Sequence, residues 1–208
     1  IADGKRVFLG GNIGTPVLEL LLKNQEVDVV VLELSSFQLE SIQSFKPTVT
    51  VVTNLEPNHL DRYPGGVEAY YSAKIRAIKN ADANSTLILN LDNPRSVQIA
   101  ENYPNGFPGQ LLYFTRRNPM NIQGFAVEQF QGAYLQRPKV IAKINGREET
   151  FDLMLTKLPG DHNRENVMAA ALACLAVGCS RVGIQKTIET FKGVQHRLEF
   201  VRKKDGVS

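Results

Sequence analysis

The chain has 208 residues, 43% of them apolar, and 24 basic against 21 acidic side chains, which leaves a formal net charge of +3. This length suits one domain with a substantial core. The charge is too small and too dispersed for a nucleic-acid surface. The longest nearly continuous apolar stretch, 167–177, is shorter than the roughly 20 residues that span a bilayer. No signal-peptide pattern begins the sequence, so we expect a cytoplasmic protein with neither nucleic acid nor membrane as a partner.

Short apolar runs alternate with helix-like segments in the first half of the chain. These runs predict strands buried on both faces, and they cover 6–9, 27–34, 48–53, 86–89 and 111–114. Thr15 followed by Pro16 predicts a helix N-cap with proline at the first helical position. We expect helices at 16–23, 67–79 and 94–101. The alternation predicts an α/β fold with a mostly parallel, doubly wound sheet flanked by helices.

The pattern changes after about residue 125. Polar and apolar residues alternate up to 155 and are interrupted by Asn145-Gly146, a strong hairpin signal, so we expect a small antiparallel sheet. Two helices are expected next, at 163–177 and 181–191. Cys174 and Cys179 have neither a second cysteine pair nor a histidine at metal-ligand spacing, which predicts buried free thiols.

The segment VVVLELSSFQLE, at 29–40, takes an apolar strand directly into Glu33, Ser35 and Ser36. Ligands of α/β sheets bind at the carboxyl ends of the strands. Hard cations such as Mg²⁺ prefer carboxylate oxygens, which makes Glu33 a candidate metal ligand. The alternative is a strand-end glutamate that pairs with a loop amide.

Further polar motifs follow other predicted elements. They are NLEPNHLDRY at 54–63, SAKIRA around Lys74, GDHNRENVMAAA from 160, and GVQHRLE at 193–199. The three histidines of the chain, His59, His162 and His196, all lie in these segments. Asn163 and Asn166 are three residues apart near a predicted helix start, so their amides share a face beside free backbone N–H groups. Ordinary helix capping would explain the same asparagines.

The segment GGNIG, at 10–14, is rich in glycine, as phosphate-binding loops are. The pattern G-x-x-x-x-G-K followed by Ser or Thr occurs nowhere in the chain. A tight turn between a strand and a helix explains these glycines equally well.

Taken together, ELSSFQLE, HLDRY, the lysine of SAKIRA, HNREN and HRLE resemble the Mur ligase family, over residues 10 to 199 or so. The first motif is most like the branch that adds D-glutamate to UDP-N-acetylmuramoyl-L-alanine. The resemblance is to the central, ATP-handling domain. It implies that 1–199 form this domain without its N-terminal phosphate-loop portion, and that 200–208 lead towards a separate C-terminal domain. We therefore expect these residues alone to be inactive.

The resemblance also implies roles for particular residues. It assigns the metal to Glu33, His59 and Lys74, catalysis to Lys74 and His59, the muramoyl substrate to Asn12 and Ser35, and the nucleotide to Asn163, Asn166 and Arg197. Lys74 would carry a carbamate, an anion with two oxygens that suits a magnesium site where an ammonium would repel the cation. Many relatives have an acid before the histidine, whereas this chain has Asn58.

The implied reaction has two steps. ATP phosphorylates the substrate carboxylate, and the amine of D-glutamate then displaces phosphate to form an amide. ATP and Mg²⁺ are the expected cofactors, small molecules the expected partners, and a monomer the expected state. Two alternatives remain open: a sibling ligase or folylpolyglutamate synthase that uses another amino acid, and a Mur-like binding module without catalytic activity.

Overall fold

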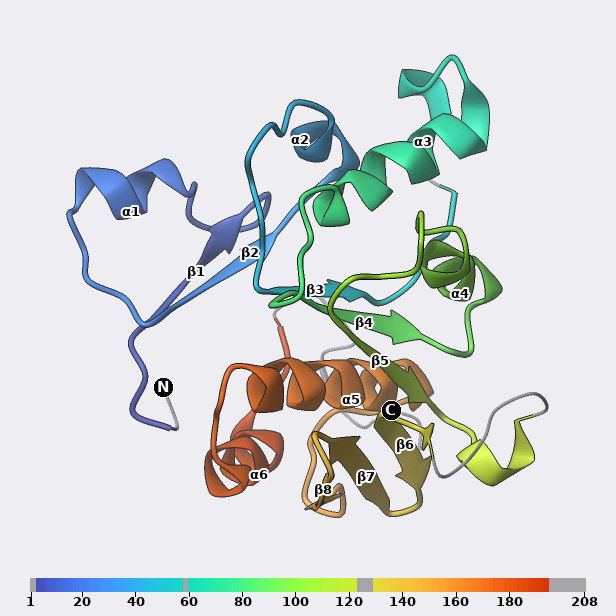
Figure 1. The fold of residues 1–208 in the computed structure, drawn as a ribbon. Helices are drawn as coiled ribbons and strands as arrows, with labels where there is room; N and C mark the ends of the chain where they lie inside the picture. The colour runs from blue at the N-terminus through green and yellow to red at the C-terminus, as the bar shows by residue number, and fades with distance from the viewer. Residues whose placement is uncertain (1–2, 58–59, 123–128, 195–208) are drawn as a thin grey trace, which may run out of the picture.

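The computed structural model describes residues 3–57, 60–122 and 129–194 (Figure 1). The strands are β1 (Val7–Gly11), β2 (Val29–Glu33), β3 (Val49–Val52), β4 (Thr86–Asn90), β5 (Gln110–Thr115), β6 (Gly132–Gln136), β7 (Lys139–Ile144) and β8 (Arg147–Asp152). The helices are α1 (Leu18–Leu22), α2 (Ser36–Glu40), α3 (Gly66–Ile75), α4 (Pro94–Glu101), α5 (Asp161–Ala176) and α6 (Arg181–Thr190). Short 3₁₀ turns are η1 (Leu60–Arg62), η2 (Arg76–Ile78) and η3 (Pro119–Asn121).

The main sheet follows the chain order from β3 to β8 within the described residues. Strands β3 to β6 are parallel, and β6, β7 and β8 are antiparallel. The predicted fold class, a mostly parallel sheet flanked by helices with an antiparallel part, is therefore confirmed. The antiparallel part is not a separate sheet, because β6 pairs with β5. A Cβ at Gly132 would lie 1.8 Å from the carbonyl oxygen of Tyr113, so glycine permits this close pairing.

Helices cover both faces of the main sheet (Figure 1). On one face, Met168 and Leu172 of α5 pack with Ile88 of β4 and with residues of β5, β7 and β8. On the other face, the core joins Leu87 and Leu89 of β4 to side chains of α3 and α4. All five residues of β4 are buried, as the continuous apolar run at 86–89 predicts for a strand enclosed between two helical layers.

Local sequence determines where some of the helices begin and end. Helix α4 begins at the predicted residue, because Asn93 caps it by accepting a 3.0 Å hydrogen bond from the Ser96 amide. Helix α1 is shorter than predicted, since the amides of Glu19 and Leu20 bond three residues back, to Pro16 and Val17, as in a turn. Helix α3 ends at Ile75 and continues as the 3₁₀ turn η2. Helix α2 was not predicted.

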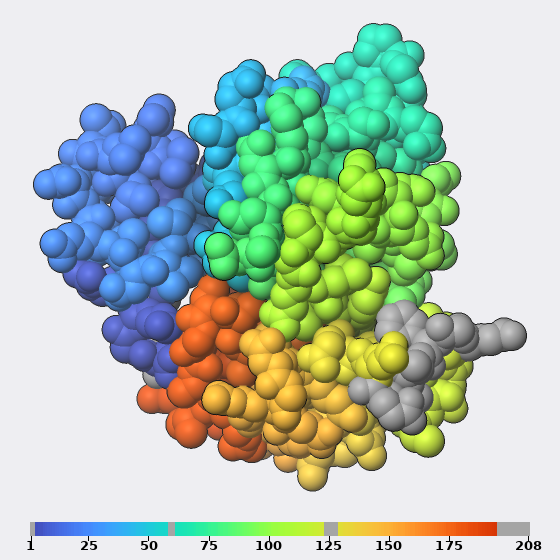
Figure 2. Space-filling model, in the orientation of Figure 1, coloured from blue at the N-terminus to red at the C-terminus, as the bar shows by residue number. Residues whose placement is uncertain are grey.

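Strands β1 and β2 form a parallel pair outside the main sheet and, with α1, stand to one side of the main body (Figure 2). Several of their apolar side chains remain exposed, among them Leu9, Leu21 and Leu22. Arg6, just before β1, pairs with Glu26 at 2.8 Å and with Asp28 at 2.9 Å, just before β2. Such exposed ion pairs stabilise little, so backbone pairing of the two strands is the main contact.

Cys174 and Cys179 are free and only partly buried, packed against the α5 side of the core. Burial, together with the adjacent Cys179 thiol, raises the pKa of the Cys174 thiol to about 11. The prediction of free thiols agrees with this structure, although their burial is partial. Over the described ranges, no helix has both the length and the apolar character that crossing a membrane requires.

The two methionines Met168 and Met154 provide a matched test of the core. Met168 is fully buried, whereas Met154 is 69% exposed. We expect Met168→Ala to lower the free energy of unfolding by about 2–5 kcal/mol through lost contacts and a cavity. We expect Met154→Ala to change it by less than about 0.5 kcal/mol. Chemical denaturation measures both, and similar losses would contradict this assignment of the core.

Candidate active site

The ends of β1 and β2 bring together two predicted site residues, Asn12 and Glu33. In the parallel register Gly11 lies opposite Glu33, and the Asn12 amide donates a 2.7 Å hydrogen bond to the Glu33 carbonyl oxygen. Both side chains thus leave the carboxyl edge of the two-stranded sheet, where α/β folds bind ligands. The Glu33 residue is exposed, as a group that binds a ligand from solvent must be.

The 10–15 segment is a tight turn. The Gly11 amide bonds the carbonyl oxygen of Thr15 at 3.0 Å, and a Cβ at Gly10 would lie 2.1 Å from that same oxygen. Gly11 itself has a φ of +113°, and a Cβ there would lie 2.3 Å from the Glu33 carbonyl oxygen. These glycines are explained by close backbone packing, which sets the position of Asn12.

Ser35 and its neighbours begin helix α2. The amide and hydroxyl of Ser35 both donate to the Gln38 side-chain oxygen, at 3.0 and 2.9 Å. Gln38 therefore fixes the serine predicted to contact substrate. Ser36 is buried, with 3% of its surface exposed. The turn places Ser35 two residues beyond Glu33 on the same strand-end loop.

Lys74 of helix α3 lies close enough to Glu33 for the two charges to interact. Burial of the Lys74 ammonium lowers its pKa, and the Glu33 carboxylate partly opposes that shift. The amine also lies 5.3 Å from the centre of the Tyr70 ring. The structure thus brings together two of the three predicted metal-site residues, from elements 41 positions apart in sequence.

His59 and Arg197 lie outside the described residues, as does His196. Among the residues that the structure describes, no three His, Cys, Asp or Glu side chains gather into a metal-binding group. The roles of His59 and Arg197 accordingly stay predictions. Of the three predicted metal-site residues, the structure describes Glu33 and Lys74.

Asn163 and Asn166 lie on the first turns of α5. The Asn163 side-chain nitrogen donates a 2.7 Å bond to the carbonyl oxygen of Pro159. This bond is not a helix cap, because a cap accepts from a backbone N–H and α5 has no side-chain cap hydrogen bond. Asn166 is exposed, and His162 is exposed with its ring over Gly160. The helix start is therefore available to a polar ligand through Asn166 and, in part, through Asn163.

A second set of polar residues near α5 was not predicted. Asn90 ends strand β4 and Asp92 and Asn93 follow it. These three residues contact the loop after β3, the end of β5 and Glu165 of α5. The same signal that identified Glu33, polar residues at the carboxyl end of a buried strand, is present in the sequence NLDN.

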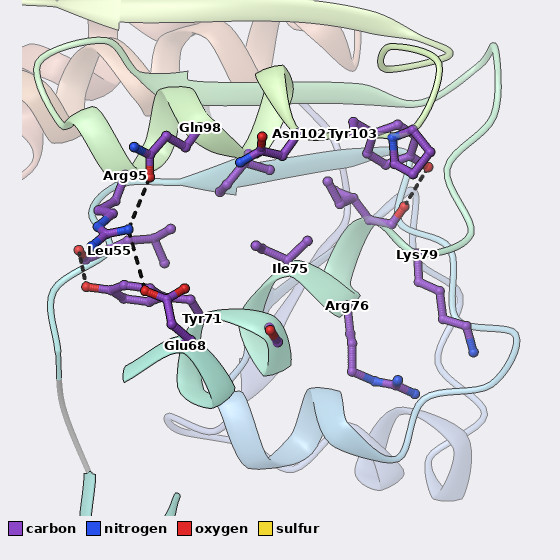
Figure 3. Close-up of a pocket in the computed structure, with 14 residues that line it drawn as sticks. Leu55, Glu68, Tyr71, Ile75, Arg76, Lys79, Arg95, Gln98, Asn102 and Tyr103 are labelled. Atoms are coloured by element: carbon purple, nitrogen blue, oxygen red, sulfur yellow. Dashed lines mark hydrogen bonds and ion pairs between the residues drawn. The ribbon is translucent and has the colours of Figure 1, made fainter. Parts of the chain in front are cut away.

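A cavity of about 560 Å³ lies between α3 and α4, away from all these residues (Figure 3). Its wall combines apolar side chains such as Ile75 and Tyr71 with Arg95, which pairs with Glu68 at 3.6 Å. Of the predicted site residues that the structure describes, none lines it. We therefore place the candidate site at the strand ends and not in this cavity.

The Mur ligase middle domain matches residues 8–174. The chain belongs to the Mur ligase family. Curated relatives named UDP-N-acetylmuramoylalanine–D-glutamate ligase match almost the whole chain. The protein from Geotalea daltonii is 36% identical over 207 residues and that from Geobacter metallireducens 37% over 206. These matches cover 100% and 99% of this chain, but the chain spans only 43% and 42% of the two relatives.

Solved structures support the fold. A UDP-N-acetylmuramoyl-L-alanyl-D-glutamate–2,6-diaminopimelate ligase matches 96% of this chain and 43% of its own with a TM-score of 0.69 at 20% identity. A pseudomurein peptide ligase type C from Methanothermus fervidus matches 97% of this chain and 52% of its own with a TM-score of 0.62, also at 20% identity. At these identities, the likeness concerns the fold alone.

Gly11 gives a test of how this site is built, with Gly14 as its control. Gly14 also has positive φ, +76°, but a Cβ there would meet nothing within 4 Å. We expect Gly14→Ala to cost about 1–2 kcal/mol of folding free energy from backbone strain alone. Gly11→Ala should cost more, because its methyl group must displace the Glu33 carbonyl. Equal losses in chemical denaturation would show that the turn does not hold Glu33.

Proposed function

We propose that this Mur ligase chain handles ATP and Mg²⁺ in a ligase that joins D-glutamate to UDP-N-acetylmuramoyl-L-alanine. The main support is the match of nearly the whole chain, at 36% identity, to proteins named for that reaction. The electrostatic interaction between Lys74 and Glu33 supports it, because the two groups were predicted for one metal site and come from separate elements. The proposal retains the expectation of a cytoplasmic monomer acting on small molecules.

The residues present suit a magnesium site once Lys74 is carbamylated. As an ammonium, Lys74 would repel a cation bound at Glu33. Its lowered pKa favours the neutral amine, which is the form that attacks CO₂, with loss of a proton, to give a carbamate. Glu33 and this carbamate would then supply carboxylate-type oxygens, the ligands that Mg²⁺ prefers. When bound, Mg²⁺ would neutralise phosphate charge during phosphoryl transfer.

The other residues position the reactants. Asn12 and Ser35, on the loops that follow β1 and β2, would contact the muramoyl substrate next to the metal site. Asn163 and Asn166 would present amides to the nucleotide at the start of α5. His59 would add a metal ligand and Arg197 a positive charge for the transferring phosphoryl group, which such a charge stabilises.

The test is phosphate release from ATP by the full-length gene product that carries these residues, with UDP-N-acetylmuramoyl-L-alanine and Mg²⁺ present. Release should require D-glutamate among the amino acids tried. Release with another amino acid would indicate a sibling ligase, and release with a folate and glutamate a folylpolyglutamate synthase. No release with any of them would favour a binding module and contradict the proposal.

The role of Lys74 is tested by Lys74→Ala beside Lys79→Ala. Lys79 is an exposed lysine of the segment that follows α3 and lines the cavity away from the site. We expect Lys74→Ala to lower the rate of phosphate release by at least about 100-fold, the upper range for loss of a group that supports a metal site. Lys79→Ala should leave the rate nearly unchanged. Equal rates in the two variants would remove Lys74 from the site.

A further inference from the structure

Residues 90–93, at the end of β4, form a polar turn that is largely buried. Asn90 is 2% exposed and Asn93 is 9% exposed, so their amides need partners within the protein. We refer to this segment as the 90–93 turn. Strand β4 is buried along its whole length, and Asn90 is its last residue. The partners of the turn come from separate parts of the chain.

The side chain of Asn90 makes two contacts with the loop after β3. Its side-chain nitrogen donates to the carbonyl oxygen of Thr53 at 3.0 Å and to the side-chain oxygen of Asn54 at 3.1 Å. Asn93 adds a third contact by donating to Glu56 at 3.2 Å. The turn therefore fixes 53–56, the segment that leads towards the predicted metal ligand His59.

Towards α5, the same Asn90 nitrogen lies 3.5 Å from a carboxylate oxygen of Glu165. The other oxygen of Glu165 pairs with Arg116 at 2.7 Å, and only 13% of the Glu165 side chain is exposed. Glu165 stands between the two predicted nucleotide residues, Asn163 and Asn166. Its two contacts hold the start of α5 against the ends of β4 and β5.

Asp92 anchors the turn itself. It accepts hydrogen bonds from the Thr115 hydroxyl at 2.9 Å, the Arg116 amide at 2.7 Å and the Arg117 side chain at 2.8 Å. The Asp92 amide in turn donates to the Asn90 side-chain oxygen at 2.9 Å. Both ends of the Asn90 amide are therefore engaged, which leaves this side chain one orientation.

We propose that Asn90 is a positioning residue that holds the loop after β3 and the start of α5 in one fixed arrangement. The side chain of Asn90 is buried and hydrogen-bonded within the protein. It acts through the loop on the metal side of the site and through Glu165 on the nucleotide side. The alignment of metal with nucleotide rests on the proposed function, whereas the coupling of the two segments does not.

Asn90→Asp, in the full-length gene product, tests this coupling. The substitution keeps the shape of the side chain but removes the donor to Thr53 and Asn54, and it places a carboxylate against Glu165. Asn80→Asp is the matched control, because Asn80 precedes the same strand and also donates to two backbone carbonyls, those of Gln43 at 2.7 Å and Phe45 at 3.0 Å. It is at the opposite end of β4.

Hydrogen exchange of backbone amides is the first measurement. Relative to Asn80→Asp, exchange in Asn90→Asp should be faster by about tenfold or more in both 53–57 and 161–166, the scale of one lost buried hydrogen bond. Acceleration in only one segment, or the same acceleration in the control, overturns the proposal. If Asn90→Asp does not fold, Glu165→Gln is the second variant, because it weakens the link to Arg116. It should accelerate exchange in both segments, to a smaller degree than Asn90→Asp. An acceleration confined to 161–166 overturns the proposal.

The reversed pair Asn90→Asp with Glu165→Gln supplies a rescue, because the new glutamine amide can donate to the new aspartate. Exchange at 161–166 should return towards the wild-type rate, and its failure to do so contradicts a direct link.

In the active enzyme, Asn90→Asp should raise the half-saturating concentrations of ATP and Mg²⁺ together, while Asn80→Asp raises neither. An inactive wild type would instead count against the proposed function, and the exchange data would still decide the coupling.

Discussion

The burial of β4 on both faces is the constraint on which the rest of this structure depends. Leu87 and Leu89 face α3 and α4, and Ile88 faces α5, so no position along the strand is free for a polar group that binds a ligand. Polar side chains gather where the strand ends, at the 90–93 turn. Parallel pairing with β3 and β5 brings the ends of those strands to the same edge. The candidate site therefore follows from the direction of the strands.

Two groups of predicted site residues, one at the ends of β1 and β2 and one at the start of α5, are positioned by different means. Asn12 and Glu33 are set by the register of β1 and β2 and by a close backbone contact that requires glycine at position 11. The start of α5 is set by hydrogen bonds and ion pairs through Glu165. Helix α3 brings Lys74 to Glu33. The positions of Asn12 and Glu33 therefore depend mainly on backbone geometry. The position of the start of α5 depends on charged side chains that have to be packed correctly.

Much of this arrangement could be predicted from sequence, because the strongest signals are local. Continuous apolar runs located β3, β4 and β5 to within a residue or two, and the helix expected at 94–101 begins and ends at those residues. The turn at Asn145-Gly146 gave the β7–β8 hairpin, where both residues have positive φ. The carboxyl end of β2 indicated Glu33. Each of these predictions depends on neighbouring residues and on the spacing of buried residues along the chain.

Contacts between distant segments could not be predicted in the same way. The pairing of β6 with β5 depends on a close approach at Gly132, and the short helix α2 has too few residues for a periodic signal. The distant partners of Asn90 come from two separate segments, the loop after β3 and helix α5. The proximity of Lys74 to Glu33 depends on how α3 packs. The family resemblance supplied that pair, whereas composition and periodicity alone would have left Lys74 a solvated side chain.

The most direct test of the central claim follows the oxygen atoms of the reaction. UDP-N-acetylmuramoyl-L-alanine labelled with ¹⁸O in its carboxylate is supplied to the full-length gene product with ATP, Mg²⁺ and D-glutamate, and both products are analysed by mass spectrometry. An acyl phosphate places one substrate oxygen on the released phosphate, so the account predicts labelled phosphate together with the D-glutamyl amide. Unlabelled phosphate, or phosphate without amide, would contradict it.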